Sequence, residues 1–111
     1  MRPRSLGTLE LNVLLAVARL ADDAYGLAVR RDVSSLMRHD YSVGAIYTTL
    51  ERLEDKGYVA SRTTDPTPRR GGRSRRHFCL TAAGRRALQE AKRLAASAWS
   101  EIGTLIVPEP T

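Results

Sequence analysis

The residues with the clearest chemistry in this sequence are arginines that gather in one short stretch. Between Arg62 and Arg76 there is a single acid, Asp65, and these 15 residues carry a net charge of +5. The whole chain of 111 residues has a formal net charge of +6, so the other 96 are almost neutral. A nearly neutral domain with one strongly basic segment is typical of a protein that binds a polyanion. The arginines are Arg62, Arg69, Arg70, Arg73, Arg75 and Arg76.

No residue pattern in the chain indicates catalysis. The sequence contains no P-loop, no dinucleotide-binding fingerprint, no Ser-His-Asp arrangement and no carboxylate pair placed for acid–base chemistry. The acids Glu51, Glu54 and Asp55 lie beside Arg52 and Lys56, as on an ordinary solvated helix face. We therefore expect a protein that is not an enzyme and that needs no cofactor.

Cysteine and histidine are scarce. Cys79 is the only cysteine, so no disulfide can form within one chain, and a reducing cytoplasm fits. His39 and His77 would need carboxylates to complete a tetrahedral zinc site with Cys79, so we expect no metal. A redox role for Cys79 is an alternative, but a thiol without a resolving partner is more often inert. Because the chain lacks a signal peptide and a run of about 20 apolar residues, we expect a cytoplasmic protein without membrane contact.

The apolar periodicity predicts four helices and one hairpin. Ser42 and Thr81 are good N-caps for the last two helices, and Gly57 ends the third. Prolines and glycines in residues 66–72 break regular structure between two alternating segments, as the tip of a hairpin does. Three helices followed by a hairpin form a winged helix-turn-helix, so the expected fold is mainly α with a small β-hairpin. The helices are expected over residues 8–20, 24–38, 43–56 and 82–106, and the strands over 58–64 and 75–80.

Two helices carry more apolar surface than one small core covers. The first is apolar on nearly every side, so it must be buried on two sides, and the second side indicates a partner subunit. In the last helix, apolar residues recur at spacings of three and four, a heptad pattern that suits a helix pair between subunits. The chain then divides into a winged helix-turn-helix domain over residues 1–81, a C-terminal dimerisation helix over 82–107 and a disordered tail over 108–111. The expected homodimer interface contains Leu11, Leu15, Leu88, Ala91, Ala95, Ala98, Trp99 and Ile102.

The sequence resembles the PadR family of transcriptional regulators. Residues 45–59 (AIYTTLERLEDKGYV) are similar to the family's Ile-Tyr-x-x-Leu-x-x-Leu-x-x-x-Gly run, and residues 72–84 (GRSRRHFCLTAAG) resemble the exit of its wing. His77-Phe78 departs from the family pattern, because two aromatic residues usually stand there. The single helix after the wing is similar to the short-tailed branch. The resemblance covers about residues 6–95. It implies a homodimeric DNA-binding repressor. Effectors in the family vary from phenolic acids to hydrophobic drugs, and some members have none known.

In a winged helix-turn-helix, the third helix lies in the major groove with its N-terminal part nearest the base edges. Ile46, Leu50 and Leu53 face the core by their spacing. The side chains left for DNA are those of Ser42, Gly44, Ala45, Thr48 and Thr49. Tyr47 could offer its hydroxyl to a phosphate, and a half-buried aromatic is the equal alternative; the resemblance favours DNA contact. Because the first two turns carry no exposed Arg, Asn or Gln, we expect little direct base readout and a contribution from DNA shape or water.

The arginine-rich loop is the strongest candidate for DNA binding. Gly71 and Gly72 form a flexible tip, which lets arginine enter a minor groove or follow phosphates. If five arginines of each subunit met phosphates, a dimer would neutralise about ten charges and bind with a steep salt dependence. The alternative is a solvated basic loop. The arginines expected to bind DNA are Arg69, Arg70, Arg73, Arg75 and Arg76.

The expected partner is double-stranded DNA with a pseudo-palindromic operator, bound by a two-fold dimer. Trp99 lies beside the heptad seam and allows two interpretations. Either it anchors the interface, which is favoured, or it binds a small hydrophobic or aromatic effector together with its symmetry copy. The alternative function is a winged-helix module that binds protein through the same surface without reading DNA.

Overall fold

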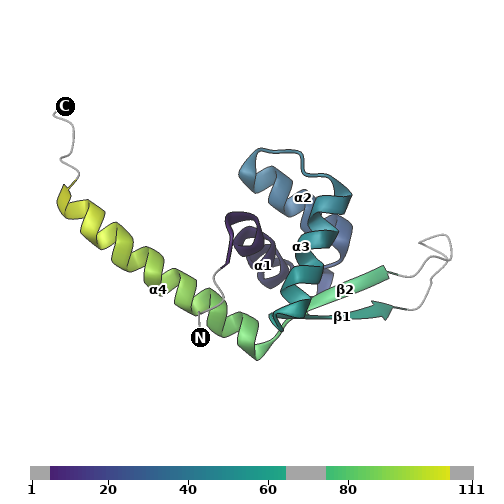
Figure 1. The fold of residues 1–111 in the computed structure, drawn as a ribbon. Coiled ribbons are helices and arrows are strands. Elements are labelled where there is room, and N and C mark those ends of the chain that lie inside the picture. The colour runs from purple at the N-terminus through teal and green to yellow at the C-terminus, as the bar shows by residue number, and fades with distance from the viewer. Residues whose placement is uncertain (1–5, 65–74, 106–111) are drawn as a thin grey trace.

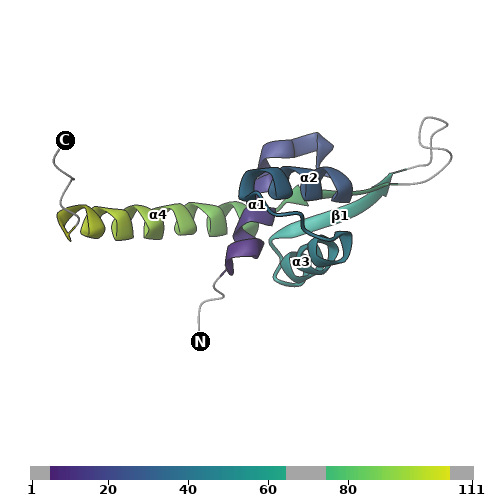
Figure 2. The same cartoon turned by 90° about the horizontal axis from the view of Figure 1, so that it is seen from above.

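The computed structural model describes residues 6–64 and 75–105. Three helices form a bundle, and a two-stranded antiparallel hairpin and a long C-terminal helix project from opposite sides of it (Figures 1 and 2). The expected fold class, mainly α with a small β-hairpin, is confirmed. In chain order the elements are α1 (Thr8–Leu20), the 3-10 helix η1 (Ala21–Asp23), α2 (Gly26–Met37), α3 (Val43–Asp55), β1 (Val59–Thr64), β2 (Arg75–Leu80) and α4 (Ala82–Leu105).

One apolar core joins the three helices of the bundle to the hairpin. Each helix turns one apolar stripe inward, as its 3.6-residue periodicity requires, and Phe78 of β2 closes the core from the hairpin side. Burial of these side chains is the main favourable term for a domain of this size. The large, fully buried aliphatic side chains are Val13, Leu14, Val17, Val29, Val33, Ile46, Leu50 and Leu53.

The helix ends follow the caps that the sequence predicts. The Ala45 amide donates to Ser42 Oγ at 3.1 Å at the start of α3, and the Gly84 amide donates to Thr81 Oγ1 at 3.0 Å at the start of α4. Gly57 has a φ of +80° just after α3, a conformation that suits glycine. These local signals set α3 and α4 within a residue of the expected bounds.

The second helix begins later than the expected residue 24, because Ala24 and Tyr25 extend the sheet. The Phe78 amide donates to the Ala24 carbonyl at 2.8 Å, and Tyr25 forms an isolated antiparallel bridge with His77. Tyr25 then serves as the N-cap residue of α2. The hydrogen bonds that hold this segment extended come from β2, far along the chain, so they outweigh its local helix signal.

The hairpin has a regular register, from Val59 opposite Leu80 to Thr64 opposite Arg75. Side chains therefore alternate between two faces. Phe78 lies on the face that packs into the core, whereas the neighbouring Cys79 is exposed. This alternation gives consecutive arginines of β2 different surroundings.

The first turns of α4 pack on the domain, and the rest of the helix leaves it. A Cβ at Gly84 would overlap the Tyr58 carbonyl, so only glycine allows this close approach. Leu88 packs against the core, but Leu94 is 54% exposed and Trp99 is 68% exposed. Figure 2 shows α4 running straight out from the bundle. Residues 108–111, expected as a disordered tail, lie outside the described residues.

Candidate nucleic-acid interface

The start of α3 presents a surface of small side chains. Ser42, Gly44 and Thr48 are exposed and Ala45 is half-buried. A Cβ built at Gly44 would have no other atom within 4 Å, so space is open there. A helix end of this kind allows another molecule to come close to its backbone, as in the major groove of DNA. Four of the five residues expected by spacing to face DNA are thus accessible.

The fifth, Thr49, is a correction to the expectation. Its residue is 4% exposed, and its Oγ1 donates a hydrogen bond of 2.8 Å to the Ala45 carbonyl. Thr49 lies three residues after Ile46 and four before Leu53, so the helix turns it toward the core. The buried hydroxyl is satisfied within the helix and is not available to DNA.

Tyr47 connects three elements. It is half-buried, its ring centroid lies 6.5 Å from that of Phe78 in an edge arrangement, and a Cβ at Gly26 would overlap its hydroxyl. The phenol therefore lies at the first residue of α2. A half-buried aromatic was one of the two interpretations left open, and a phosphate contact through the hydroxyl stays a prediction.

The two arginines at the start of β2 have different partners. Arg76 donates a hydrogen bond of 2.6 Å to Glu54 Oε1 on α3, and Ser61 Oγ of β1 donates to the other oxygen of the same carboxylate at 2.6 Å. The Arg76 guanidinium also lies 5.1 Å from the centroid of the Phe78 ring. Arg76 is thus engaged within the protein, a role that the sequence alone did not indicate. Arg69, Arg70 and Arg73 lie outside the described residues.

Arg75 stacks on an aromatic ring instead. Its guanidinium carbon lies 4.2 Å from the centroid of Tyr25, and Arg31 of α2 donates to the Tyr25 hydroxyl at 2.9 Å. We call Tyr25, Arg31 and Arg75 the Tyr25 cluster. Two guanidinium groups on one phenol concentrate positive charge. Among the residues that the structure describes, no carboxylate forms an ion pair with Arg31.

The Tyr25 cluster lies close to the start of α3. Tyr25 precedes Gly26, whose Cα lies against the Tyr47 hydroxyl, and Tyr25 is bridged to His77 of β2. The beginning of α2, Tyr47 in the first half of α3 and the loop-side half of β2 therefore lie side by side. Sequence reasoning missed Tyr25 and Arg31, because residues 31 and 75 are related only through the folded chain. The adjacent Arg30 and Arg31 were a signal that could have pointed to this surface.

Part of the expected dimer surface is exposed in the single chain. Leu11 and Leu15 of α1 are half-buried but do not belong to the core cluster, and Leu88 and Ala91 are half-buried at the base of α4. Ala95, Ala98 and Trp99 are exposed, and Leu94, which the heptad pattern did not include, is exposed beside them. The side chain of Ile102 lies outside the described residues.

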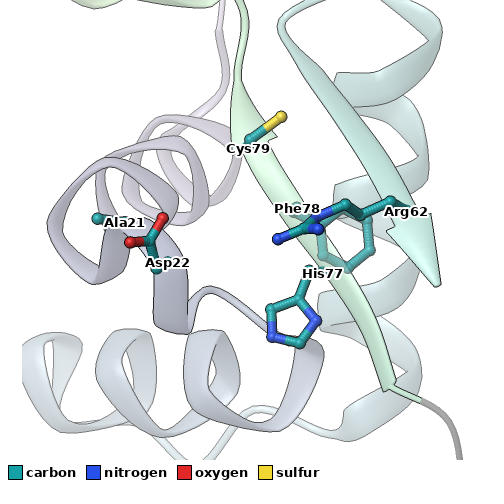
Figure 3. Close-up of a pocket in the computed structure, with 6 residues that line it drawn as sticks. All are labelled: Ala21, Asp22, Arg62, His77, Phe78 and Cys79. Carbon is teal, nitrogen blue, oxygen red and sulfur yellow. The ribbon is translucent and has the colours of Figure 1, made fainter. Parts of the chain in front are cut away.

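A shallow hollow lies between η1 and the hairpin (Figure 3). It measures about 270 Å³, part of it open solvent, and His77 and the exposed Cys79 contribute to its wall. Nδ1 of His77 is buried and makes no hydrogen bond in the described part of the chain. No three metal-binding side chains gather within the described ranges. The hollow is lined by Ala21, Asp22, Arg62, His77, Phe78 and Cys79.

None of the helices in the described part of the chain is long and apolar enough to cross a membrane.

Comparison with known proteins gives matches along most of the chain. The family model described as "Transcriptional regulator PadR-like family" matches residues 14–90. No curated protein matches the chain.

Three solved structures share the fold. A PadR family transcriptional regulator from Eggerthella lenta is 25% identical, with a TM-score of 0.68, covering 91% of this chain and 89% of its own. A PadR-like transcription factor from Bacteroides fragilis is 21% identical, with a TM-score of 0.74 and coverage of 90% and 91%. A PadR-like transcriptional regulator from Bacillus cereus is 20% identical, with a TM-score of 0.73 and coverage of 93% and 95%.

Proposed function

Because the chain belongs to the PadR-like family of transcriptional regulators, we propose that it binds operator DNA as a homodimer and represses transcription there. The observation that carries this proposal is that the Tyr25 cluster, on α2 and the loop-side half of β2, lies beside α3, whose first residues are exposed. In a DNA duplex the base edges lie between two lines of phosphates. A helix that enters the groove, with guanidinium groups beside it, matches this arrangement.

Each part of this surface has its own task. The first turns of α3 enter the major groove, where Gly44 leaves room for the base edges. Arg31 and Arg75 bind phosphates beside that groove, with the Tyr25 ring holding the Arg75 guanidinium in place. The loop arginines Arg69, Arg70 and Arg73 extend the contact along the backbone or into the minor groove. Phosphate contacts position the protein, and α3 supplies the base contacts.

Dimerisation covers the apolar stripe of α4. Leu88 and Ala91 begin the stripe at the domain, and Leu94, Ala98 and Trp99 continue it where no part of the described chain covers them. The outer side chains of α1, Leu11 and Leu15, form a second apolar surface outside the core. Leaving apolar side chains in contact with water costs free energy, so burial of both surfaces against a second copy of the chain stabilises a dimer.

The two-fold symmetry of the dimer determines the operator. Two α3 helices related by a two-fold axis fit successive major grooves, about 34 Å apart, so the operator is pseudo-palindromic. A small hydrophobic effector that stacks on the exposed Trp99 would change the spacing of the two helices. It lowers DNA affinity only to the extent that it binds one spacing better than the other.

Titration of a labelled duplex from the region upstream of the protein's own gene tests DNA binding. We expect binding that weakens steeply between about 50 and 200 mM salt, as phosphate contacts dictate. Arg75→Ala should weaken it at all salt concentrations, whereas Arg93→Ala should not, because Arg93 pairs with Glu90 on the polar side of α4. A winged-helix module that binds protein instead would show no duplex affinity that depends on Arg75, and this result would reject the proposal.

A further inference from the structure

Val43 is an apolar side chain that the core does not cover. It is the first residue of α3 and is 41% exposed, whereas Ile46 and Leu50 of the same helix are fully buried. The sequence pattern groups Val43 with these core residues, because it precedes them at spacings of three and seven. In the fold, the first residue of α3 lies beyond the edge of the apolar core, so no core residue covers Val43 fully. The isopropyl group therefore lies at the end of α3 that carries the proposed base contacts.

The side chains around Val43 offer few polar groups. Ser42 Oγ accepts the Ala45 amide, and Gly44 presents only backbone. Residues 43–49 (VGAIYTT) contain no acid, no amide and no basic side chain. The hydroxyl of Thr49 donates its hydrogen bond to the Ala45 carbonyl within the helix. Apart from the hydroxyls of Ser42 and Thr48, which can contact any of the bases, this end of α3 presents methyl groups close to the backbone.

The major groove contains one group that matches such a surface. Guanine is recognised by Arg or Lys, adenine by Asn or Gln and cytosine by an acid, and none of these stands in residues 43–49. Thymine carries the C5-methyl, the apolar group on the major-groove edges. We propose that Val43 recognises thymine by contact with this methyl, so that each operator half-site has a T·A pair facing the start of α3. The inference rests on the proposed function, because it requires α3 in the major groove.

Removal of single methyl groups from the DNA tests the contact. Binding sites are first selected from a random duplex library with the full-length protein. Each thymine of a selected half-site is then replaced, one at a time, by deoxyuridine, which differs only by the methyl. We expect one thymine in each half-site at which the replacement weakens binding about fourfold, the factor that burial of one methyl supplies.

The variant Val43→Ala tests whether the contact with the thymine methyl comes from Val43. It should bind the thymine duplex about fourfold more weakly than the wild type and should lose the response to deoxyuridine at that position. Because Val43 is exposed, the variant should retain the wild-type melting temperature. Leu36→Ala is the matched control, since Leu36 is an exposed aliphatic residue of α2, at 59% exposure, and this variant should keep the full deoxyuridine response.

The outcomes separate this inference from the proposed function. Sequence-selective binding with no deoxyuridine effect at any position overturns the inference and leaves the function standing. The same holds if Val43→Ala keeps the wild-type response to deoxyuridine. Failure to select or bind any duplex overturns the proposed function, and the thymine contact with it.

Discussion

Arg76 donates a hydrogen bond of 2.6 Å to Glu54, and this ion pair joins β2 to the last turn of α3. Its preceding neighbour, Arg75, stacks on Tyr25 and belongs to the surface proposed to bind DNA. The two neighbouring residues are of the same type, but the fold gives their side chains different partners. Arg76 links the hairpin to α3 through Glu54, whereas Arg75 lies on Tyr25 and is proposed to contact phosphate.

The two arginines should respond differently to the same substitution. Arg75→Gln should reduce the slope of log affinity against log salt by about 1, the change expected for one lost phosphate contact. Arg76→Gln should leave that slope unchanged and destabilise the fold by less than about 1 kcal/mol, because the ion pair is one-third exposed. Duplex titrations at several salt concentrations and thermal unfolding measure the two effects. Equal slopes for both variants would contradict this division.

Gly44 provides a prediction in which stability and DNA binding change in opposite directions. No other atom of the protein lies near the position of the Cβ that Gly44 lacks. Gly44→Ala should therefore stabilise α3 by about 0.5 kcal/mol, because alanine lowers the backbone entropy of the unfolded chain. The same methyl would occupy space that base edges need, and we expect duplex affinity to fall about tenfold. Thermal unfolding and duplex titration of one variant measure both. If the variant is stabilised and binds DNA as tightly as the wild type, the DNA major groove does not lie against Gly44.

The Tyr25 cluster predicts a graded series. Arg31→Gln should lower the salt slope by about 1, as loss of a phosphate contact does. Tyr25→Phe keeps the ring under Arg75 and removes only the hydroxyl that holds Arg31 at 2.9 Å, so it should cost less affinity than Arg31→Gln. Both effects should be uniform across DNA sequences. An effect confined to particular base pairs would assign the cluster to base recognition instead.

The exposed stripe on α4 predicts a self-association that a single charge disrupts. Leu94→Glu places a carboxylate among apolar side chains and should convert a dimer to monomers in sedimentation equilibrium, because burial of an unpaired charge is costly. Gln89→Glu adds the same charge at another exposed position of α4 and is the control. A wild-type chain that sediments as a monomer at working concentrations would refute the proposed dimer.

Glu10 gives the domain a defined response to acid. Burial raises the pKa of this carboxyl, but the hydrogen bonds from Lys56 and the Gly7 amide and the nearby charges of Lys56 and Arg52 outweigh burial, so the pKa lies below its ordinary value of 4.5. A lowered folded-state pKa stabilises the protein above pH 4.5, and the contribution is lost as pH falls through the folded value. Glu10→Gln should cost about 1 kcal/mol at neutral pH. The difference in melting temperature should disappear in acid, and a constant difference would contradict the assignment.

Local signals were sufficient to predict most of the fold. Apolar periodicity, the caps Ser42 and Thr81 and the stop at Gly57 act within a few residues, so α3, α4 and both strands lie close to their expected bounds. The start of α2 was wrong because the partner of Ala24 is β2, about fifty residues later. A signal that depends on distant backbone cannot be seen in the local pattern.

The site was less predictable than the fold, for the same physical reason. Thr49 is polar by type, yet its hydroxyl finds the Ala45 carbonyl, so burial costs it little. Arg31 joins the surface proposed to bind DNA only because the fold brings it to Tyr25, and Arg76 pairs with Glu54 only because the fold brings β2 to α3. Composition predicted that arginine matters, whereas the pairing of individual arginines is a tertiary property.

Hydroxyl-radical footprinting on a duplex selected by the protein tests most directly whether a two-fold dimer binds DNA through paired α3 helices. The prediction is two protected segments related by a two-fold axis and separated by about one helical turn, 10–10.5 base pairs, or a multiple of it. Protection of one segment only, or uniform protection without a centre of symmetry, would contradict it.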